Sequence, residues 1–138
     1  MPNPPADPAI IRNYHVHVYY DPATTRARAE RLRERVAAEF PQAMLGRWHD
    51  ALVGPHPQSM FQIAFPREML ASFVPWLMLN RDGLTLLLHP DTGDAYVDHA
   101  EHAAWFGAVP SVVGGGIATV LIVAAFAAGS RELRRWTE

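Results

Sequence analysis

The chain contains no cysteine, and this absence removes several kinds of site at once. Without thiols we expect no disulfide scaffold, no thiolate zinc site and no cysteine nucleophile. A surplus of positive charge is also missing, because the formal net charge at pH 7 is -2. Nucleic acid is therefore not an expected partner. What the chain has instead is seven histidines in 138 residues.

The first residues lack both the basic region and the apolar run of a signal peptide. Four of the first eight are prolines, and we expect a short disordered or extended lead over residues 1–12 and a cytoplasmic location. The total length fits one domain, and 49% hydrophobic residues are enough for a real core.

Two histidines lie close together in the sequence Tyr14-His15-Val16-His17-Val18-Tyr19-Tyr20. A strand has a side-chain period of two, which places the histidines and Tyr19 on one face and the two valines on the other. Adjacent imidazoles on the polar face of a strand are typical of the beginning of a metal site.

Hydrophobic periodicity and breaker residues predict four strands and two main helices. The strands are expected at residues 13–20, 44–49, 59–65 and 84–89, and the helices at 23–40 and 66–80. A further short helix is expected at 98–106. The order strand, helix, strand, strand, helix, strand predicts an α+β, ferredoxin-like βαββαβ fold: one antiparallel sheet with two helices on one face.

The face of this sheet without helices should carry most of the polar chemistry. In this fold the first strand is central and neighbours the fourth, where paired Cβ atoms lie roughly 5 Å apart. His15 or His17 is therefore expected to meet His89 across the ladder. The residues predicted on this open face are His15, His17, Tyr19, Gln62 and His89.

An uncharged apolar stretch covers Val109 to Gly129, and three arginines follow it. About 20 apolar residues is the length of a membrane span. Pro110 and the run of glycines at 114–116 are poor helix material, and arginines beyond the span oppose the positive-inside tendency. Residues 108–138 are therefore expected to form an apolar tail, either a buried or swapped helix or a membrane anchor.

Six segments in one order resemble the DOPA 4,5-dioxygenase family, and the similarity runs from about Asn13 to Gly107. The tail that follows has no counterpart in the family pattern. The segments are Tyr14-His15-Val16-His17-Val18-Tyr19, Gly46-Arg47-Trp48-His49-Asp50, Val53-Gly54-Pro55-His56-Pro57, Trp76-Leu77-Met78-Leu79-Asn80-Arg81, Leu88-His89-Pro90-Asp91-Thr92-Gly93-Asp94 and Asp98-His99-Ala100-Glu101-His102-Ala103.

The resemblance implies a ferredoxin-like domain at 13–107, often a homodimer. It also implies extradiol cleavage of a catechol such as L-DOPA by O₂ at non-haem iron(II). Such iron needs few protein ligands and open positions, typically two histidines and a carboxylate, or three histidines. We expect the ligands to be His17, His56 and His89, with Pro55 and Pro57 restricting the loop around His56. Asp98 or Glu101 is a candidate carboxylate ligand or hydrogen-bond partner of a ligand.

Three further histidines are candidate catalytic residues. His15 is the expected acid/base, since an imidazole titrates near neutral pH, and metal ligation is its alternative role. His49 follows Arg47 by two residues, so both should point the same way, and Arg47 is suited to binding a substrate carboxylate. His99 and His102 should share one face of the short helix, although a solvated face is the alternative, especially for His99. Tyr19 and Gln62 are expected to line the pocket.

Two other readings keep the same residues. Imidazole binds zinc as well as iron, so an activated water and hydrolase or lyase chemistry would use the same histidines. A non-catalytic ferredoxin-like dimer that binds a small ligand is the alternative from another functional class. Trp48, Trp76 and Trp105 are expected in the core or at an interface.

Overall fold

A computed structural model describes residues 4–107 of the chain. Five antiparallel strands form one sheet in the order β2-β3-β1-β4-β5. Their bounds are β1 Asn13–Tyr20, β2 Met44–Leu45, β3 Ser59–Pro66, β4 Thr85–Asp91 and β5 Ala104–Phe106. The first four strands have the order of a ferredoxin-like sheet, and β5 adds a fifth strand beside β4. The predicted α+β, ferredoxin-like fold is confirmed.

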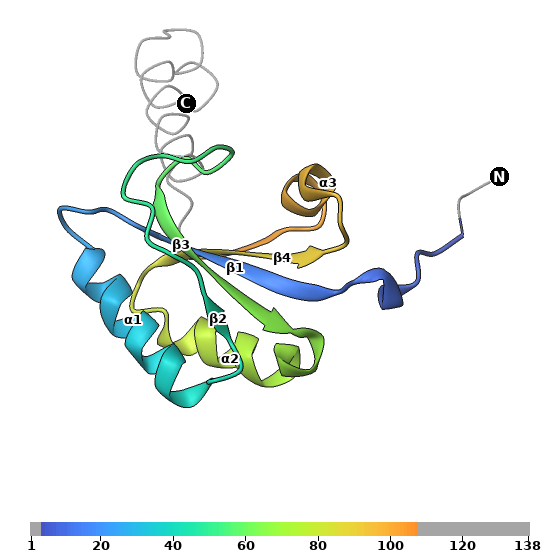
Figure 1. Ribbon diagram of the computed structural model, residues 1–138, viewed down its shortest axis with the longest axis horizontal. Helices are drawn as coiled ribbons and strands as arrows, with labels where there is room; N and C mark the ends of the chain where they lie inside the picture. Colours follow the sequence, from blue (N-terminus) through green and yellow to red (C-terminus); the bar gives the residue numbers. More distant parts are fainter. Residues whose placement is uncertain (1–3, 108–138) are drawn as a thin grey trace, which may run out of the picture. The chain divides into compact units, whose positions relative to one another are not determined.

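Two helices, α1 Arg26–Glu39 and α2 Leu70–Asn80, lie on the same side of the sheet (Figure 1). In α1 the buried residues Ala29, Leu32 and Val36 recur at three- and four-residue spacing, which makes one apolar stripe. The core between helices and sheet also contains Val16, Val18, Phe61, Ile63, Phe65, Phe73, Leu77 and Leu86. The alternation predicted for the first and third strands therefore places the expected side chains in the core.

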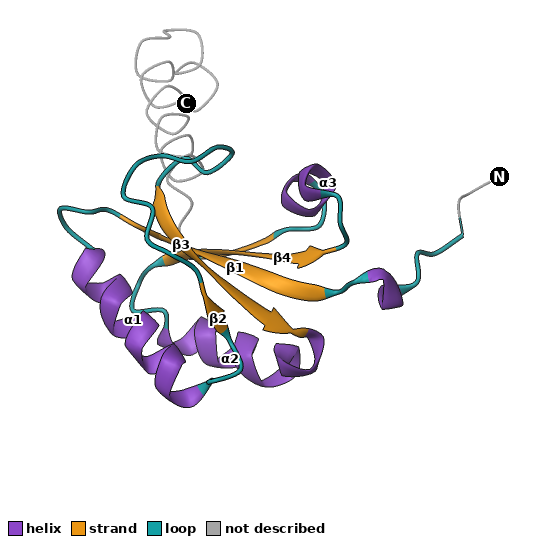
Figure 2. Ribbon diagram, viewed as in Figure 1, coloured by secondary structure: helices purple, strands orange, loops and turns teal. Residues whose placement is uncertain are grey.

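The opposite face of the sheet is covered only in part. A third helix, α3 Ala95–Ala100, lies there, and so does the long loop between β2 and β3 (Figures 1 and 2). The register of β1 with β4 places His15 opposite His89 and His17 opposite Leu87. Gln62 of β3 is opposite His17 on the other side. The predicted meeting of the first and fourth strands at these histidines is confirmed.

Several predicted elements are wrong in their bounds. The second helix, expected at 66–80, begins at Leu70 after a 3-10 turn over Arg67–Met69. The helix expected at 98–106 is instead α3, which ends at Ala100, followed by β5. The second strand was expected to reach His49, but β2 ends at Leu45 and His49 only forms an isolated bridge with Met60. The first helix begins at Arg26 rather than at 23, because the Asp21 carboxylate accepts from the backbone of Ala23 and Thr24 and holds a turn there.

The lead that we expected to be extended holds one turn of 3-10 helix, Pro8–Ile10, capped by Asp7. Within residues 4–107, no helix has both the length and the apolar character that crossing a membrane requires. The apolar stretch at 109–129 lies outside the described residues, and so do the predictions made for the tail. The predicted homodimer and cytoplasmic location stay predictions.

Candidate metal centre

His17 lies at the centre of a group of histidines on the open face of the sheet. Its side chain is only 3% exposed, although it is on the face that α1 and α2 do not cover. The rings of His56, His89 and His99 lie around it, with ring centroids 4.1, 5.2 and 5.3 Å from that of His17. Four segments far apart in sequence thus meet at one imidazole.

The loop between β2 and β3 brings His56 to this group. The backbone amide of His56 donates to the carbonyl of Val53 at 2.9 Å, which closes a turn before the histidine. The Tyr19 hydroxyl and the His56 Nδ1 lie 2.8 Å apart. His56 is buried, with 9% of its surface exposed. The interpretation of this segment as a rigid loop over the sheet agrees with these contacts.

Helix α3 brings His99, because two carboxylates fix the helix in place. Asp94 caps its first turn by accepting from the amides of Tyr96 and Val97. Asp98 is 2% exposed and accepts from the amide and hydroxyl of Thr92 at 2.9 and 2.7 Å. The Asp98 carboxylate is therefore occupied by Thr92. His99 is half-buried beside His17, so the solvated face that was its alternative is wrong.

The ring nitrogens of these histidines converge. The Nε2 atom of His17 lies 3.0 Å from Nε2 of His89 and 3.3 Å from Nε2 of His99. With metal–imidazole bonds of about 2.1 Å, two nitrogens on one ion lie about 2.9 to 3.4 Å apart for angles between 90° and tetrahedral. The observed separations fall in this range.

Backbone carbonyls fix which nitrogen of two histidines carries the proton. A carbonyl can only accept, so Nδ1 of His89 donates to Pro90 and Nδ1 of His99 donates to Ala95, each at 2.7 Å. In the neutral rings both Nε2 atoms are then unprotonated and present their lone pairs to His17. Metal-ligating histidines usually have this arrangement, with the outer nitrogen donating to the protein.

The metal-free protein cannot satisfy His17. Its Nδ1 is buried without a hydrogen-bond partner among the described residues, while its Nε2 faces two lone pairs. Whichever nitrogen carries the proton, one buried polar atom lacks a partner, and such an atom costs about 1–3 kcal/mol. A cation shared by these nitrogens would replace lone-pair repulsion by coordination. The residues present therefore fit a metal ion.

Two overlapping sets of three histidines are possible ligand sets. His17, His56 and His99 have ligand atoms that all lie within 4.8 Å of one another. His17, His89 and His99 are joined by the direct Nε2 contacts. His17 and His99 belong to both sets. The set predicted from sequence, His17, His56 and His89, shares two members with each.

Burial and mutual repulsion keep the imidazoles of His17, His56 and His89 neutral. The pKa of His17 is lowered to about 2, first by burial and then by the neighbouring histidines. The same causes lower the pKa of His56 to about 4. Burial also lowers the pKa of His89 and of His15. At neutral pH the lone pairs that His17, His56 and His89 need for coordination are thus free of protons.

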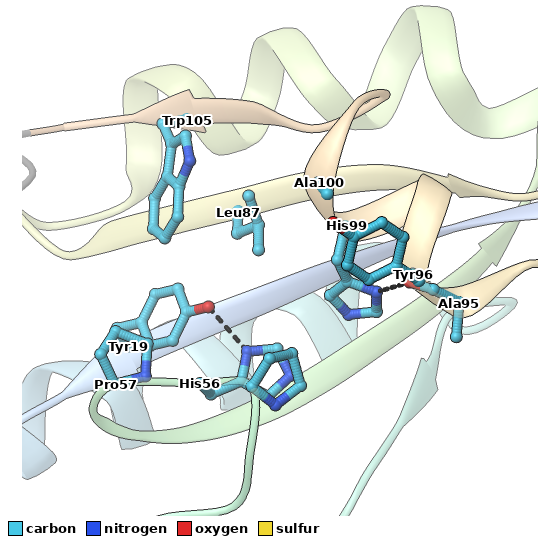
Figure 3. A pocket seen from close by; sticks show the side chains of 10 residues that line it. Tyr19, His56, Pro57, Leu87, Ala95, Tyr96, His99, Ala100 and Trp105 are labelled. Atoms are coloured by element: carbon cyan, nitrogen blue, oxygen red, sulfur yellow. Dashed lines mark hydrogen bonds between the residues drawn. The ribbon is translucent and has the colours of Figure 1, made fainter.

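A cavity of about 360 Å³ opens beside the histidines (Figure 3). His56 and His99 reach it, and aromatic and apolar side chains from β1, α3, β4 and β5 complete its walls. The Tyr19 ring packs nearly parallel to that of Trp105, with centroids 5.5 Å apart. The volume of the cavity is typical of a site that binds a small organic molecule. The lining residues are Tyr19, Pro55, His56, Pro57, Leu87, Ala95, Tyr96, His99, Ala100 and Trp105.

The remaining predicted site residues have different positions. His15 lies edge-on to His89, with ring centroids 5.2 Å apart. His49 is half-buried, and its proximity contributes to the lowered pKa of His56. Gln62 is half-buried on β3 and does not line the cavity. Arg47 and Glu101 are exposed and outside it.

His102 is not part of the histidine group. Its side chain is exposed and lines a separate hollow, which Tyr14 and residues 6–8, 10 and 11 of the lead help to form. The helix predicted at 98–106 would have placed His99 and His102 on one face, but α3 ends between them. The roles assigned to His15, His49, His102, Arg47 and Gln62 stay predictions.

Several residues of the site, among them His99 and Trp105, were not assigned to it from the sequence. His99 was left open between a site residue and a solvated residue, and Trp105 was expected in the core or an interface. The strand β5 that positions Trp105 is only three residues long and gives no readable alternation. The Asp94 cap, an acidic residue before a short helical run, was the available signal for α3.

The chain is similar to a solved structure in both sequence and fold. A crystal structure of a proposed dioxygenase from Nostoc punctiforme matches with a TM-score of 0.72 and 48% sequence identity. The match covers 76% of this chain and 90% of that one.

Two curated fungal relatives match as well. An uncharacterized 21.2 kDa protein of Botryotinia fuckeliana is 35% identical over 113 residues, which is 75% of this chain and 62% of the relative. A DOPA 4,5-dioxygenase of Amanita muscaria is 33% identical over 104 residues, 70% of this chain and 46% of the relative. The chain thus spans less than two thirds of the length of either relative.

The family match extends slightly beyond the resemblance read from the motifs. It covers residues 14–113, whereas the motifs ended at Gly107. It therefore includes the whole described histidine group and the first residues of the predicted tail. With the family model matching most of the chain, the protein belongs to the Dopa 4,5-dioxygenase family.

Proposed function

We propose that the protein is a ring-cleaving dioxygenase that opens a catechol, such as L-DOPA, at a histidine-bound non-haem iron(II). The observation that carries the proposal is the convergence of the His17, His89 and His99 Nε2 atoms beside a cavity large enough for one aromatic ring. An all-histidine ligand set leaves open positions on the metal.

The reaction adds both atoms of O₂ to the catechol and breaks the ring bond beside the two hydroxyl-bearing carbons. Bound iron(II) would supply the activation of oxygen that this step needs. The protein would hold and orient the ring. Tyr19, Leu87 and Trp105 form apolar walls that fix the ring plane, and the loop with Pro55 and Pro57 limits access of water.

A proton must leave the catechol when it binds, and a nearby base is needed. His56 lines the cavity and its Nδ1 is 2.8 Å from the Tyr19 hydroxyl, so this ring can take a proton at Nε2 while Tyr19 holds its orientation. His15, whose ring lies edge-on to that of His89, keeps as an alternative the acid/base role predicted for it.

The test is anaerobic loading of the purified protein with iron(II), followed by L-DOPA or catechol and then air. A yellow ring-opened semialdehyde supports the proposal. His17→Ala and His99→Ala should abolish it, while Leu79→Ala, at an exposed position outside the cavity, is the control. The two possible ligand sets differ in whether His56 or His89 is the third ligand. Of the variants His56→Ala and His89→Ala, the one that removes a ligand should lose iron binding, and the other should retain it. Product formation that survives His17→Ala would contradict the proposal.

A further inference from the structure

The cavity beside the histidines has two ends of different chemistry. His99 lies towards one end, and Trp105 towards the other, with Leu87 between them (Figure 3). Tyr19 packs against Trp105 at this second end, and Pro57 lies beside Tyr19 (Figure 3). If the hydroxyl groups of a catechol point to the histidines, the ring substituent points to the apolar end.

The described residues at the apolar end offer no partner for a charged substituent. Among residues 4–107, neither an arginine nor a carboxylate lines the cavity. Arg47, the predicted partner of a substrate carboxylate, is exposed and outside it. Burying a carboxylate without a partner is costly, whereas each buried methylene group raises affinity by about fourfold.

We propose that the substrate of this protein is a catechol whose ring carries an uncharged, apolar substituent, and that Trp105 and Leu87 select it. This inference rests on the proposed function for its reaction, but the recognition itself concerns only the cavity. L-DOPA, with a carboxylate and an ammonium group on the substituent, is then bound and cleaved less efficiently than such a catechol.

The experiment compares three catechols of similar length: 4-propylcatechol, 3-(3,4-dihydroxyphenyl)propionate and L-DOPA. Dissociation constants are measured by calorimetry on the metal-free full chain, and kcat/KM on the iron-loaded chain. We expect 4-propylcatechol to bind at least about tenfold more tightly than 3-(3,4-dihydroxyphenyl)propionate or L-DOPA, the two compounds with a carboxylate. In the series methyl, ethyl, propyl, affinity should rise by about fourfold per methylene group at most.

Two variants test the assignment of the cavity. Trp105 is 43% exposed and lies at the apolar end, so Trp105→Arg should fold and should raise the affinity for the propionate about tenfold. Leu79→Arg introduces the same charge at an 87% exposed position outside the cavity and should leave the preference unchanged. Trp105→Ala should flatten the rise in affinity along the alkyl series.

The outcomes separate the two proposals. Equal or better binding and cleavage of L-DOPA would overturn the apolar substrate class while supporting the dioxygenase. Graded binding of the alkylcatechols without cleavage of any catechol would support the recognition and overturn the dioxygenase. An alkyl series without any trend in affinity would overturn the recognition even if catechol is cleaved.

Discussion

The two faces of the sheet are built by alternate residues of the same strands, yet one face stabilises the fold and the other forms the candidate metal site. In β1, Val16 and Val18 are fully buried against the helices, while His15 and His17 face the other way. The first face packs mainly apolar side chains against the helices and provides stability. The second buries His17 with one nitrogen unpaired, which costs stability and prepares a binding site.

The largest expected effect is on the helix-covered face. Phe61→Ala leaves a cavity in the core and should lower the free energy of unfolding by about 3–5 kcal/mol. Chemical denaturation measures this loss, with Leu79→Ala at an exposed position as the control. The metal affinity of the folded variant should stay within about threefold, and a large loss of affinity would show that the two faces are not independent.

On the histidine face we expect a substitution that raises the free energy of unfolding instead of lowering it. His17→Leu removes a buried polar group that lacks a partner, so the metal-free protein should gain about 1–3 kcal/mol of stability. Denaturation in the presence of a chelator checks this. Destabilisation of the metal-free protein by His17→Leu would mean that the imidazole contributes to the fold and is not held there for binding.

The pH dependence of stability should come from the same face. The pKa of His17 is about 2 in the folded protein against 6.5 for a free histidine, and that of His56 is about 4. The unfolded chain therefore binds protons below pH 6.5 that the folded chain does not, and stability falls as the pH falls. Each such histidine contributes about 1.4 kcal/mol per pH unit.

Denaturation of the metal-free protein between pH 7 and pH 5 measures this slope. His17→Leu should reduce it by the share of one histidine, while Leu79→Ala, at an exposed position without a titratable group, should leave it unchanged. A slope that is identical in His17→Leu and in the unaltered protein would contradict the buried, neutral state of His17.

The smallest effect is expected at Tyr19. Tyr19→Phe removes the hydroxyl that lies 2.8 Å from His56 and should cost about 1 kcal/mol of stability. The orientation of His56 would be less fixed, so kcat should fall by about tenfold or less. Tyr14→Phe, on the helix-covered face of the same strand, is the control, since Tyr14 packs with Phe65. Equal kcat losses in both variants would remove the role given to the Tyr19–His56 contact.

The sequence predicted the two faces because strands have a strict period of two. His15, His17, Tyr19, Gln62 and His89 all lie on the face expected for them, since the valines and phenylalanines between them fix the register. The loop position of His56 followed from its flanking prolines, but its distance to His17 depends on a loop path that no periodicity encodes.

The predictions were poorest after β4, where elements are short. Six residues of helix and three of strand give too few repeats for a period to be read. His99 and Trp105 lie in these elements. His102 does not line the cavity because α3 ends at Ala100, before this residue. Arg47, earlier in the chain, lies outside the cavity and beyond the end of β2 at Leu45.

The central claim is that the histidine face binds one metal ion, and a titration of the metal-free protein with cobalt(II) tests it most directly. The visible absorption of cobalt reports its coordination, and calorimetry gives the stoichiometry. We predict one ion per chain, with binding lost in His17→Leu and His99→Ala and retained in His102→Ala. Binding that is absent, or unaffected by loss of His17, would contradict the account.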